Sequence, residues 1–149
     1  YRAYHQGQRI DYRELANPHV HQTLNQLKNT GWRLALASSS PRANIEQVLR
    51  ELAILPLFEV IASGNDFRES KPNPEIYLHV AAQLYAKPQH CTVIEDSTYG
   101  IQAAVRASMR VLAKRDERYG FDQSPAHALF DDLAEIPALL EGRPADALH

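Results

Sequence analysis

Short apolar runs alternate with longer stretches of helical periodicity along most of this chain. Five of the runs have the composition of buried strands, at 32–37, 58–62, 91–94, 110–113 and 128–130. Apolar residues at helical spacing fill the segments around them, as Val20, Leu24 and Leu27 do before the first run. Strands that alternate with helices form βαβ units. The sequence therefore predicts an α/β fold with a parallel sheet and helices on both faces.

Capping residues predict where the helices begin and end. A first helix is expected over 18–28, and Gly31 beyond its end suits the left-handed backbone of a helix stop. Ser40 and Pro41 have the N-cap and first-position preferences of a second helix, and Asn73 and Pro74 have those of a third. Further helices are expected over 99–107 and 133–140.

The composition fits one ordinary domain and argues against several partners. The chain has 149 residues, of which 44% are apolar and 23% charged, with a formal net charge of −2. This balance offers no positive surface for nucleic acid or an anionic membrane. No apolar run approaches the roughly 18 residues of a membrane helix. Cys91 is the only cysteine, which excludes an intrachain disulfide and fits the reducing cytoplasm, where we expect the protein.

Polar groups follow three of the predicted strands at the point where each strand ends. They are the segments 38–40 (Ser-Ser-Ser), 63–66 (Ser-Gly-Asn-Asp) and 95–97 (Glu-Asp-Ser). Ligands of open α/β sheets bind beyond the carboxyl ends of the strands. We therefore expect the functional site at this edge of the sheet.

The residue types at this edge suit an anionic ligand and a metal. Serine hydroxyls before a helix N-terminus can bind an anion. Lys71 precedes a predicted helix N-terminus, where its charge is unfavourable unless an anion or a carboxylate offsets it. Glu95 and Asp96 offer the hard oxygen ligands that Mg²⁺ prefers. Each signal also has a structural alternative, in which Ser40, Asp96 or Ser97 only caps a helix and Lys71 is a solvated loop residue.

The order of these signals, and the strings around them, resemble the haloacid dehalogenase (HAD) superfamily. Serine after a strand, lysine before a helix and an acidic pair after a later strand are similar to its motifs II, III and IV. The strings LALASSS followed by Pro41-Arg42, SKPNPEIY and IEDSTYGIQAA resemble more narrowly the β-phosphoglucomutase-like phosphatases. The resemblance covers roughly 18–140 and implies a Rossmann-like core and phosphoryl transfer on a small phosphorylated sugar.

The resemblance implies catalytic and metal-binding roles for matched residues. Ser38 corresponds to the hydroxyl that binds the transferring phosphoryl group, with Ser39 beside it through its backbone. Lys71 corresponds to the lysine that neutralises the phosphoryl group and the nucleophilic carboxylate. Glu95 and Asp96 resemble the acids that hold Mg²⁺, directly or through water. A lysine and Mg²⁺ on opposite sides of a phosphate suit a reaction that depends on positioning and charge neutralisation.

The resemblance also implies a second phosphate contact. Ser40 and Arg42 fall where the sugar mutases of this group contact the non-reacting phosphate of the substrate. Pro41 stands where the mutases often have a polar residue, which removes one possible contact.

One part of the family pattern is absent from this sequence. The family begins with an Asp-x-Asp motif after its first strand, and the first Asp attacks phosphorus while the second acts as acid and base. No Asp-x-Asp occurs here. The strand before that motif is the central one of the family's sheet, so we expect a core without its central strand and nucleophile. The chain opens on Tyr1 and resembles a piece of a longer product. We expect 1–16 to be the end of a helical cap domain, 17–142 an incomplete core and 143–149 a tail.

Two hypotheses of function follow from these patterns. The first is a Mg²⁺-dependent phosphatase or mutase whose nucleophile lies outside this chain, so that the segment alone is inactive and another chain or segment supplies the strand. The second is a truncated, non-catalytic paralogue that binds a phosphate-bearing ligand or a partner chain. A receiver-type phosphoacceptor domain fits less well, because its acidic pair should come early in the chain and its lysine late.

Overall fold

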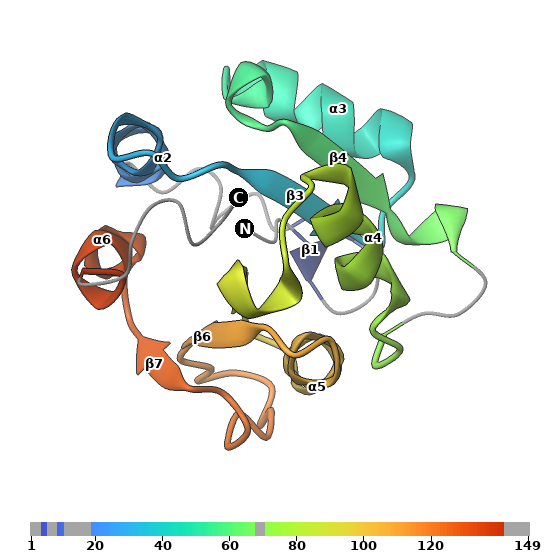
Figure 1. Ribbon diagram of the computed structural model, residues 1–149, viewed down its shortest axis with the longest axis vertical. Helices are drawn as coiled ribbons and strands as arrows, with labels where there is room; N and C mark the ends of the chain where they lie inside the picture. The colour runs from blue at the N-terminus through green and yellow to red at the C-terminus, as the bar shows by residue number, and fades with distance from the viewer. Residues whose placement is uncertain (1–3, 6–8, 11–18, 68–70, 142–149) are drawn as a thin grey trace.

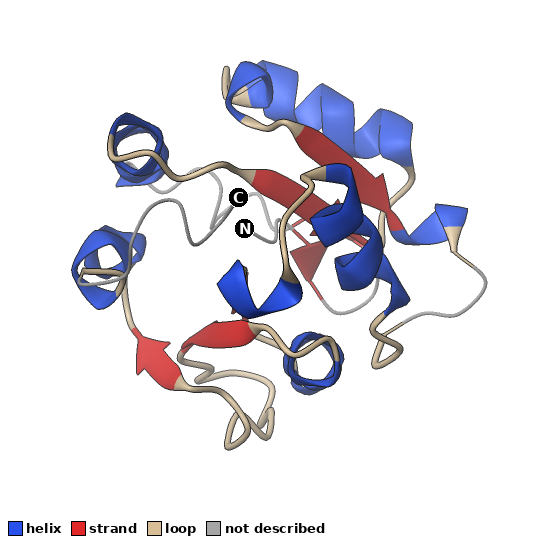
Figure 2. Cartoon of the chain, in the orientation of Figure 1, coloured by secondary structure: helices blue, strands red, loops and turns tan. Residues whose placement is uncertain are grey.

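Two parallel sheets form the framework of the molecule. The computed structural model describes residues 4–5, 9–10, 19–67 and 71–141. The larger sheet has the strand order β5-β6-β7 and the smaller one β3-β4, while β1 and β2 form a separate antiparallel pair (Figure 1, Figure 2). The strands are β1 (Tyr4–His5), β2 (Arg9–Ile10), β3 (Ala35–Ser38), β4 (Val60–Ser63), β5 (Thr92–Glu95), β6 (Arg110–Lys114) and β7 (Ala128–Phe130).

Helices alternate with the strands along the chain and cover both faces of the sheets (Figure 1). The α-helices are α2 (His19–Asn29), α3 (Arg42–Glu51), α4 (Glu75–Gln83), α5 (Thr98–Arg106) and α6 (Ile136–Leu139). Single 3₁₀ turns are η1 (Leu55–Leu57), η2 (Gly64–Asp66), η3 (Pro88–His90) and η4 (Leu133–Glu135). The predicted α/β fold with parallel strands and helices on both faces is therefore confirmed. None of the helices in these ranges is long and apolar enough to cross a membrane.

The buried apolar residues form two clusters, one on each face of the sheets. On one face α2, α3 and α6 pack against Leu36 of β3 and Leu112 of β6. On the other face α4 and α5 pack against Ala37 of β3 and Val111 of β6. Side chains of neighbouring strand residues point to opposite faces, so each strand contributes to both clusters. The continuous apolar runs in the sequence are thus explained by strands that are covered on both sides.

Helix α4 sets the relative direction of the two sheets. At its carboxyl end, the carbonyl of Leu84 accepts a 2.7 Å hydrogen bond from Arg33, which precedes β3. In its first turn, Tyr77 donates a 2.8 Å hydrogen bond to Glu95, the last residue of β5. The start of β3 therefore lies at the end of α4, and the end of β5 lies at its beginning. It follows that β3 and β5 run in the same direction and that their carboxyl ends meet at one edge.

Most of the predicted boundaries are within two or three residues of the observed ones, but the predicted N-cap at Ser40 was wrong. Helix α3 begins at Arg42, its N-cap residue is Pro41, and no side chain caps it. Ser40 is instead buried, and its backbone N–H donates to the hydroxyl of Ser38 at 3.1 Å. Gly31 has a φ of 95°, which agrees with its predicted place after a helix. Helix α4 has Pro74 as its N-cap residue, one residue later than predicted, and Asn73 accepts a hydrogen bond from the backbone of Glu75 at 2.9 Å.

Only two short segments of the predicted cap remnant are described. Tyr4–His5 and Arg9–Ile10 pair as antiparallel strands rather than as a helix. The other residues of 1–16, Pro18 at the predicted helix start and the predicted tail at 143–149 lie outside the described residues. The assignment of these segments to a cap domain and a tail stays a prediction.

Candidate functional site

A buried ion pair joins Lys71 to the end of β5. The amino group of Lys71 lies 3.3 Å from Oε2 of Glu95, with side-chain exposures of 7% and 0%. The same amino group lies 4.9 Å from the centre of the Tyr77 ring, which adds a cation–π contact. Lys71 is thus not a solvated loop lysine. Its positive charge lies at the carboxyl end of β5.

Both carboxylate oxygens of Glu95 accept hydrogen bonds from protein groups. Oε2 accepts from Lys71 and from the hydroxyl of Tyr77, and Oε1 accepts from the backbone N–H of Asp96 at 2.9 Å and of Ser97 at 3.3 Å. This arrangement satisfies a buried charge that would otherwise be costly. Glu95 therefore holds Lys71 in place, and its predicted role as a metal ligand stays a prediction.

Gly100 makes room for the Glu95 carboxylate at the start of α5. A Cβ atom on Gly100 would lie 2.1 Å from both Cδ and Oε2 of Glu95. The backbone N–H of Gly100 is in turn capped by the hydroxyl of Ser97 at 3.1 Å. The structural alternative for Ser97, a helix cap, is therefore confirmed, and the glycine allows the helix start and the carboxylate to approach each other.

Asp96 follows Glu95 at the carboxyl end of β5, and a hydrogen bond to its backbone carbonyl holds it in position. Its backbone carbonyl accepts a 2.9 Å hydrogen bond from the side-chain amide of Gln123, which also donates to the carbonyl of Lys114 at 2.7 Å. Gln123 thereby links the end of β5 to the end of β6. Within the described ranges, no group of three or more His, Cys, Asp or Glu side chains is close enough to hold a metal.

The loop that carries Gln123 is ordered by a carboxylate. Burial alone would raise the pKa of Asp116, but backbone N–H groups of Phe121, Arg118 and Tyr119 donate to the carboxylate and lower its pKa below the ordinary value. The backbone N–H of Asp116 donates to the Gln123 side chain at 3.0 Å. This network fixes the position from which Gln123 contacts Asp96.

The serines lie at the carboxyl end of β3. The register of the strands pairs Ser38 with Ser63 of β4, and the hydroxyl of Ser63 donates to the carbonyl of Ser40 at 2.7 Å. Ser38, Ser40 and Ser63 are buried, and Ser39 is half-buried. Gly64 allows the close approach here, because a Cβ on it would lie 3.0 Å from Cα of Ser39.

Arg42 contacts β4 and the turn that follows it. Its guanidinium donates to the carbonyl of Ile61 at 2.6 Å and lies 3.6 Å from the carboxylate of Asp66. These contacts tie the start of α3 to β4 and η2. The structure brings Lys71, Glu95 and Asp96 together at one strand end and places Ser38 at the parallel end of β3. It does not place Arg42 in contact with any of them.

The sequence reasoning missed Tyr77, Gly100 and Gln123. The first two lie in the strings SKPNPEIY and IEDSTYGIQAA, so the motifs contained them, although no role was assigned to either. A tyrosine six residues after Lys71 and a glycine five residues after Glu95 could have suggested contact with the ion pair. Gln123 carries no comparable signal, because it lies 27 residues after Asp96 in a loop.

Comparison with known proteins places these observations in a family. A sequence profile described as haloacid dehalogenase-like hydrolase matches residues 2–114. The phosphorylated carbohydrates phosphatase of Thermotoga maritima is 36% identical over 135 residues, which cover 89% of this chain and 58% of the relative. The β-phosphoglucomutase of Bacillus subtilis is 40% identical over 92 residues, which cover 62% of this chain and 40% of the relative.

Solved structures agree with the sequence matches. The crystal structure of CbbY from Rhodobacter sphaeroides in complex with xylulose-1,5-bisphosphate superposes with a TM-score of 0.73 at 28% identity. The superposition covers 83% of this chain and 60% of that chain. The chain thus spans between two fifths and three fifths of the length of these three proteins. On the strength of the profile, the relatives and the shared fold, this chain belongs to the haloacid dehalogenase-like hydrolase family.

Proposed function

We propose that these residues form part of a Mg²⁺-dependent enzyme that transfers or hydrolyses the phosphoryl group of a small phosphorylated sugar. The observation that carries the proposal is the buried pair of Lys71 and Glu95 beside Asp96, at the same edge as Ser38. A positive charge, a hydroxyl and a carboxylate that can bind a metal are groups that phosphoryl transfer uses. The nucleophile, an aspartate that becomes an aspartyl-phosphate, would lie outside this chain.

The roles of the residues follow from their surroundings. Lys71, held by Glu95 and Tyr77, would donate to the phosphoryl oxygens and offset their charge. Ser38 and the backbone of Ser39 would bind another phosphoryl oxygen at the end of β3. Asp96 would be the carboxylate that binds Mg²⁺, because both oxygens of Glu95 already have protein donors.

The donor set fits a magnesium ion. Mg²⁺ keeps several waters and takes one or two carboxylates together with substrate phosphate, so a single carboxylate from this chain is compatible with it. When bound, Mg²⁺ would neutralise negative charge on the phosphate. The printed names of the relatives, a phosphorylated carbohydrates phosphatase and a β-phosphoglucomutase, support a sugar phosphate as substrate. Ser40 is proposed as a contact to the substrate. Arg42 would serve in this role only after leaving Ile61 and Asp66.

We further propose a division of the chain into three parts. Residues 1–16 would belong to a cap, 17–142 to the core and 143–149 to a tail. The strand that carries the nucleophile would come from another segment or chain. The sole cysteine, Cys91, still supports the cytoplasm as the expected location.

A chimera with the Thermotoga maritima phosphatase tests the proposal. The 135 aligned residues of that relative would be replaced by those of this chain, so that the rest of the relative supplies what lies outside it. The chimera should hydrolyse sugar phosphates only when Mg²⁺ is present. Lys71→Met or Asp96→Ala should lower kcat by at least about 100-fold.

A matched control separates this result from general damage. Lys87→Met removes an exposed lysine before β5, at the opposite end of that strand, and should leave kcat unchanged. Circular dichroism should show that all three variants keep the fold. Metal-independent hydrolysis, or full activity of Asp96→Ala, would contradict the proposed roles.

A further inference from the structure

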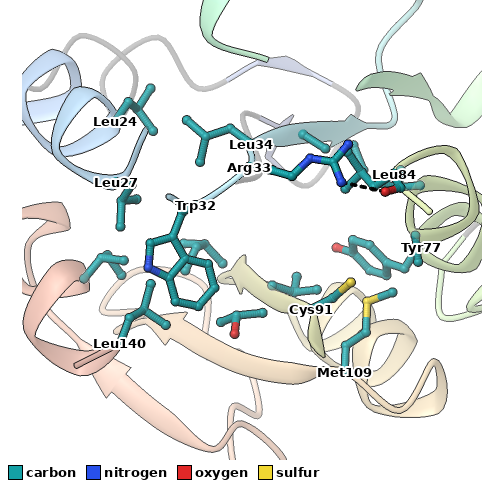
Figure 3. A pocket seen from close by; sticks show the side chains of 18 of the residues that line it. Leu24, Leu27, Trp32, Arg33, Leu34, Tyr77, Leu84, Cys91, Met109 and Leu140 are labelled. Carbon is teal, nitrogen blue, oxygen red and sulfur yellow. Dashed lines mark hydrogen bonds between the residues drawn. The ribbon is translucent and has the colours of Figure 1, made fainter. Parts of the chain in front are cut away.

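We infer that Tyr77 is a positioning residue, whose hydroxyl and ring together set how far the amino group of Lys71 lies from Glu95. The hydroxyl shares one carboxylate oxygen with the lysine, and the ring lies against the charge of the lysine. Figure 3 shows the Tyr77 side chain reaching from α4 into the space between the sheets, with the hydroxyl oxygen at its tip. The consequence for phosphoryl transfer rests on the proposed function, whereas the geometry of the three side chains does not.

Two donors share the same oxygen of Glu95, and they share it unequally. The hydroxyl of Tyr77 lies 2.8 Å from Oε2, and the amino group of Lys71 lies 3.3 Å from the same atom. Hydrogen bonds between an ammonium and a carboxylate are ordinarily about 2.7–2.9 Å long. The tyrosine therefore has the short bond and the lysine has a long one, although the lysine carries the charge.

The rest of the carboxylate is fixed, so a rotation of Glu95 cannot relieve the competition at Oε2. The other oxygen, Oε1, accepts from the backbone N–H groups of Asp96 and Ser97 at 2.9 and 3.3 Å. Gly100 borders Oε2 from the side of α5, because a Cβ there would lie 2.1 Å from this oxygen. Lys71 is therefore the partner that is kept at a distance.

The ring of Tyr77 supplies the second contact to the lysine. The amino group of Lys71 lies 4.9 Å from the ring centre, within the range of a cation–π interaction. The ring belongs to the apolar cluster under α4 and α5, and the residue is only 5% exposed. Because a closely packed side chain has little freedom to move, the ring fixes the place of the ammonium.

The long bond to Glu95 has a consequence for the proposed reaction. Without the tyrosine hydroxyl at Oε2, Coulomb attraction in this buried place would draw the ammonium of Lys71 closer to the carboxylate. The lysine would then offset less of the negative charge of a phosphoryl group. Tyr77 thereby divides the charge of the lysine between Glu95 and the phosphate. It acts through these two side chains, so it is a positioning residue and not a catalytic one.

Tyr77→Phe tests the role of the hydroxyl, because it keeps the packed ring. Acetylation of residues 1–149 followed by mass spectrometry reports the surroundings of Lys71 without any need for activity. The variant should slow the labelling of Lys71 at least about threefold relative to the exposed Lys87, because the ion pair tightens. Tyr85→Phe removes the hydroxyl of a side chain that is 92% exposed and should leave the labelling unchanged. Circular dichroism should show that both variants keep the fold.

Kinetics of the chimera measure the effect on the reaction. Tyr77→Phe should lower kcat about tenfold, which is the factor of one hydrogen bond to the phosphoryl group. It should also weaken the inhibition by inorganic phosphate about tenfold, because the same lysine binds that anion. Tyr77→Leu removes the ring as well and should lower kcat about threefold further. Tyr85→Phe should leave kcat and the inhibition unchanged.

A second background separates positioning from general packing. Glu95→Gln removes the charge that draws the lysine inward, so Tyr77→Phe should change kcat by less than about twofold in that background. A tenfold loss there as well would assign Tyr77 a merely structural role and overturn the inference.

The labelling and the kinetics together distinguish this inference from the proposed function. Slower labelling of Lys71 in Tyr77→Phe, together with an inactive wild-type chimera, would support the positioning of the lysine and overturn the proposed function. A chimera that loses activity in Lys71→Met, but whose labelling and kcat do not respond to Tyr77→Phe, would overturn the positioning role alone.

Discussion

Replacing Gly100 with alanine should destabilise the protein, although the position is inside a helix. In a helix an alanine is ordinarily better than a glycine by about 1 kcal/mol. Here the new Cβ would lie 2.1 Å from Cδ and Oε2 of Glu95. Carbon atoms in contact are normally about 3.5–4 Å apart, so the carboxylate or the helix start must move by roughly 1.5 Å.

The size of the effect follows from the bonds of the displaced carboxylate. Glu95 would lose its hydrogen bonds to Tyr77, at 2.8 Å, and to Lys71, at 3.3 Å. A hydrogen bond to a charged group contributes about 1.5–3 kcal/mol. After subtraction of the gain in helix propensity, we expect Gly100→Ala to lower the free energy of unfolding by about 2–5 kcal/mol.

Urea unfolding of the chimera measures this change, and a double-mutant cycle assigns its cause. In a Glu95→Ala background the side chain that blocks Cβ is gone, so Gly100→Ala should there be neutral or stabilising. The interaction energy of the cycle should then be as large as the single-variant effect. If Gly100→Ala stabilises the protein that still has Glu95, the packing argument is refuted, because helix propensity alone would then determine the change in stability.

Two further predictions concern groups around the site. Gln123→Leu removes the side-chain hydrogen bond to the carbonyl of Asp96. It should raise the Mg²⁺ concentration needed for half-maximal activity of the chimera about tenfold. A metal titration measures this change, and kcat at saturating Mg²⁺ serves as the control. An unchanged Mg²⁺ requirement would exclude a positioning role. A hydrogen bond from the backbone N–H of Ala134 and one from His19 lower the pKa of Asp132 in the folded protein. The carboxylate of Asp132 should therefore stabilise the protein fully above the unfolded pKa of about 3.9. This stabilisation should disappear as the pH falls through the lower pKa of the folded state. Because Asp132 is half-exposed, the difference between the wild type and Asp132→Asn in urea unfolding should stay below about 1 kcal/mol at pH 6. The difference should shrink steadily as the pH falls below the unfolded pKa, and a constant difference would contradict the assignment.

The order of elements and the meeting of Lys71 with the acidic pair could be predicted from the sequence. Alternating strands and helices leave few topologies, and all strand ends of a parallel sheet lie at one edge. The motifs carried no information on which oxygen of Glu95 meets which donor. That choice depends on the first turn of α4, where Tyr77 takes one oxygen, and on backbone N–H groups after β5, which take the other.

Other features of the structure could not be predicted from local sequence patterns. Ser40 has the residue type of an N-cap, but its burial beneath Ser63 removes it from that role, and burial depends on contacts between distant segments. Gln123 contacts Asp96 only because the loop after β6 folds back around Asp116. The antiparallel pairing of Tyr4–His5 with Arg9–Ile10 has no strand signal longer than two residues.

The position of α4 has a consequence for how this site can change in evolution. The helix has nine residues and is about 13 Å long, and it joins the start of β3 to the end of β5. A substitution at Arg33, at the far end of the helix, would therefore tilt α4 and alter the spacing between Ser38 and Asp96 without touching either. Substrate preference could drift through such remote substitutions while every residue of the site itself stays the same.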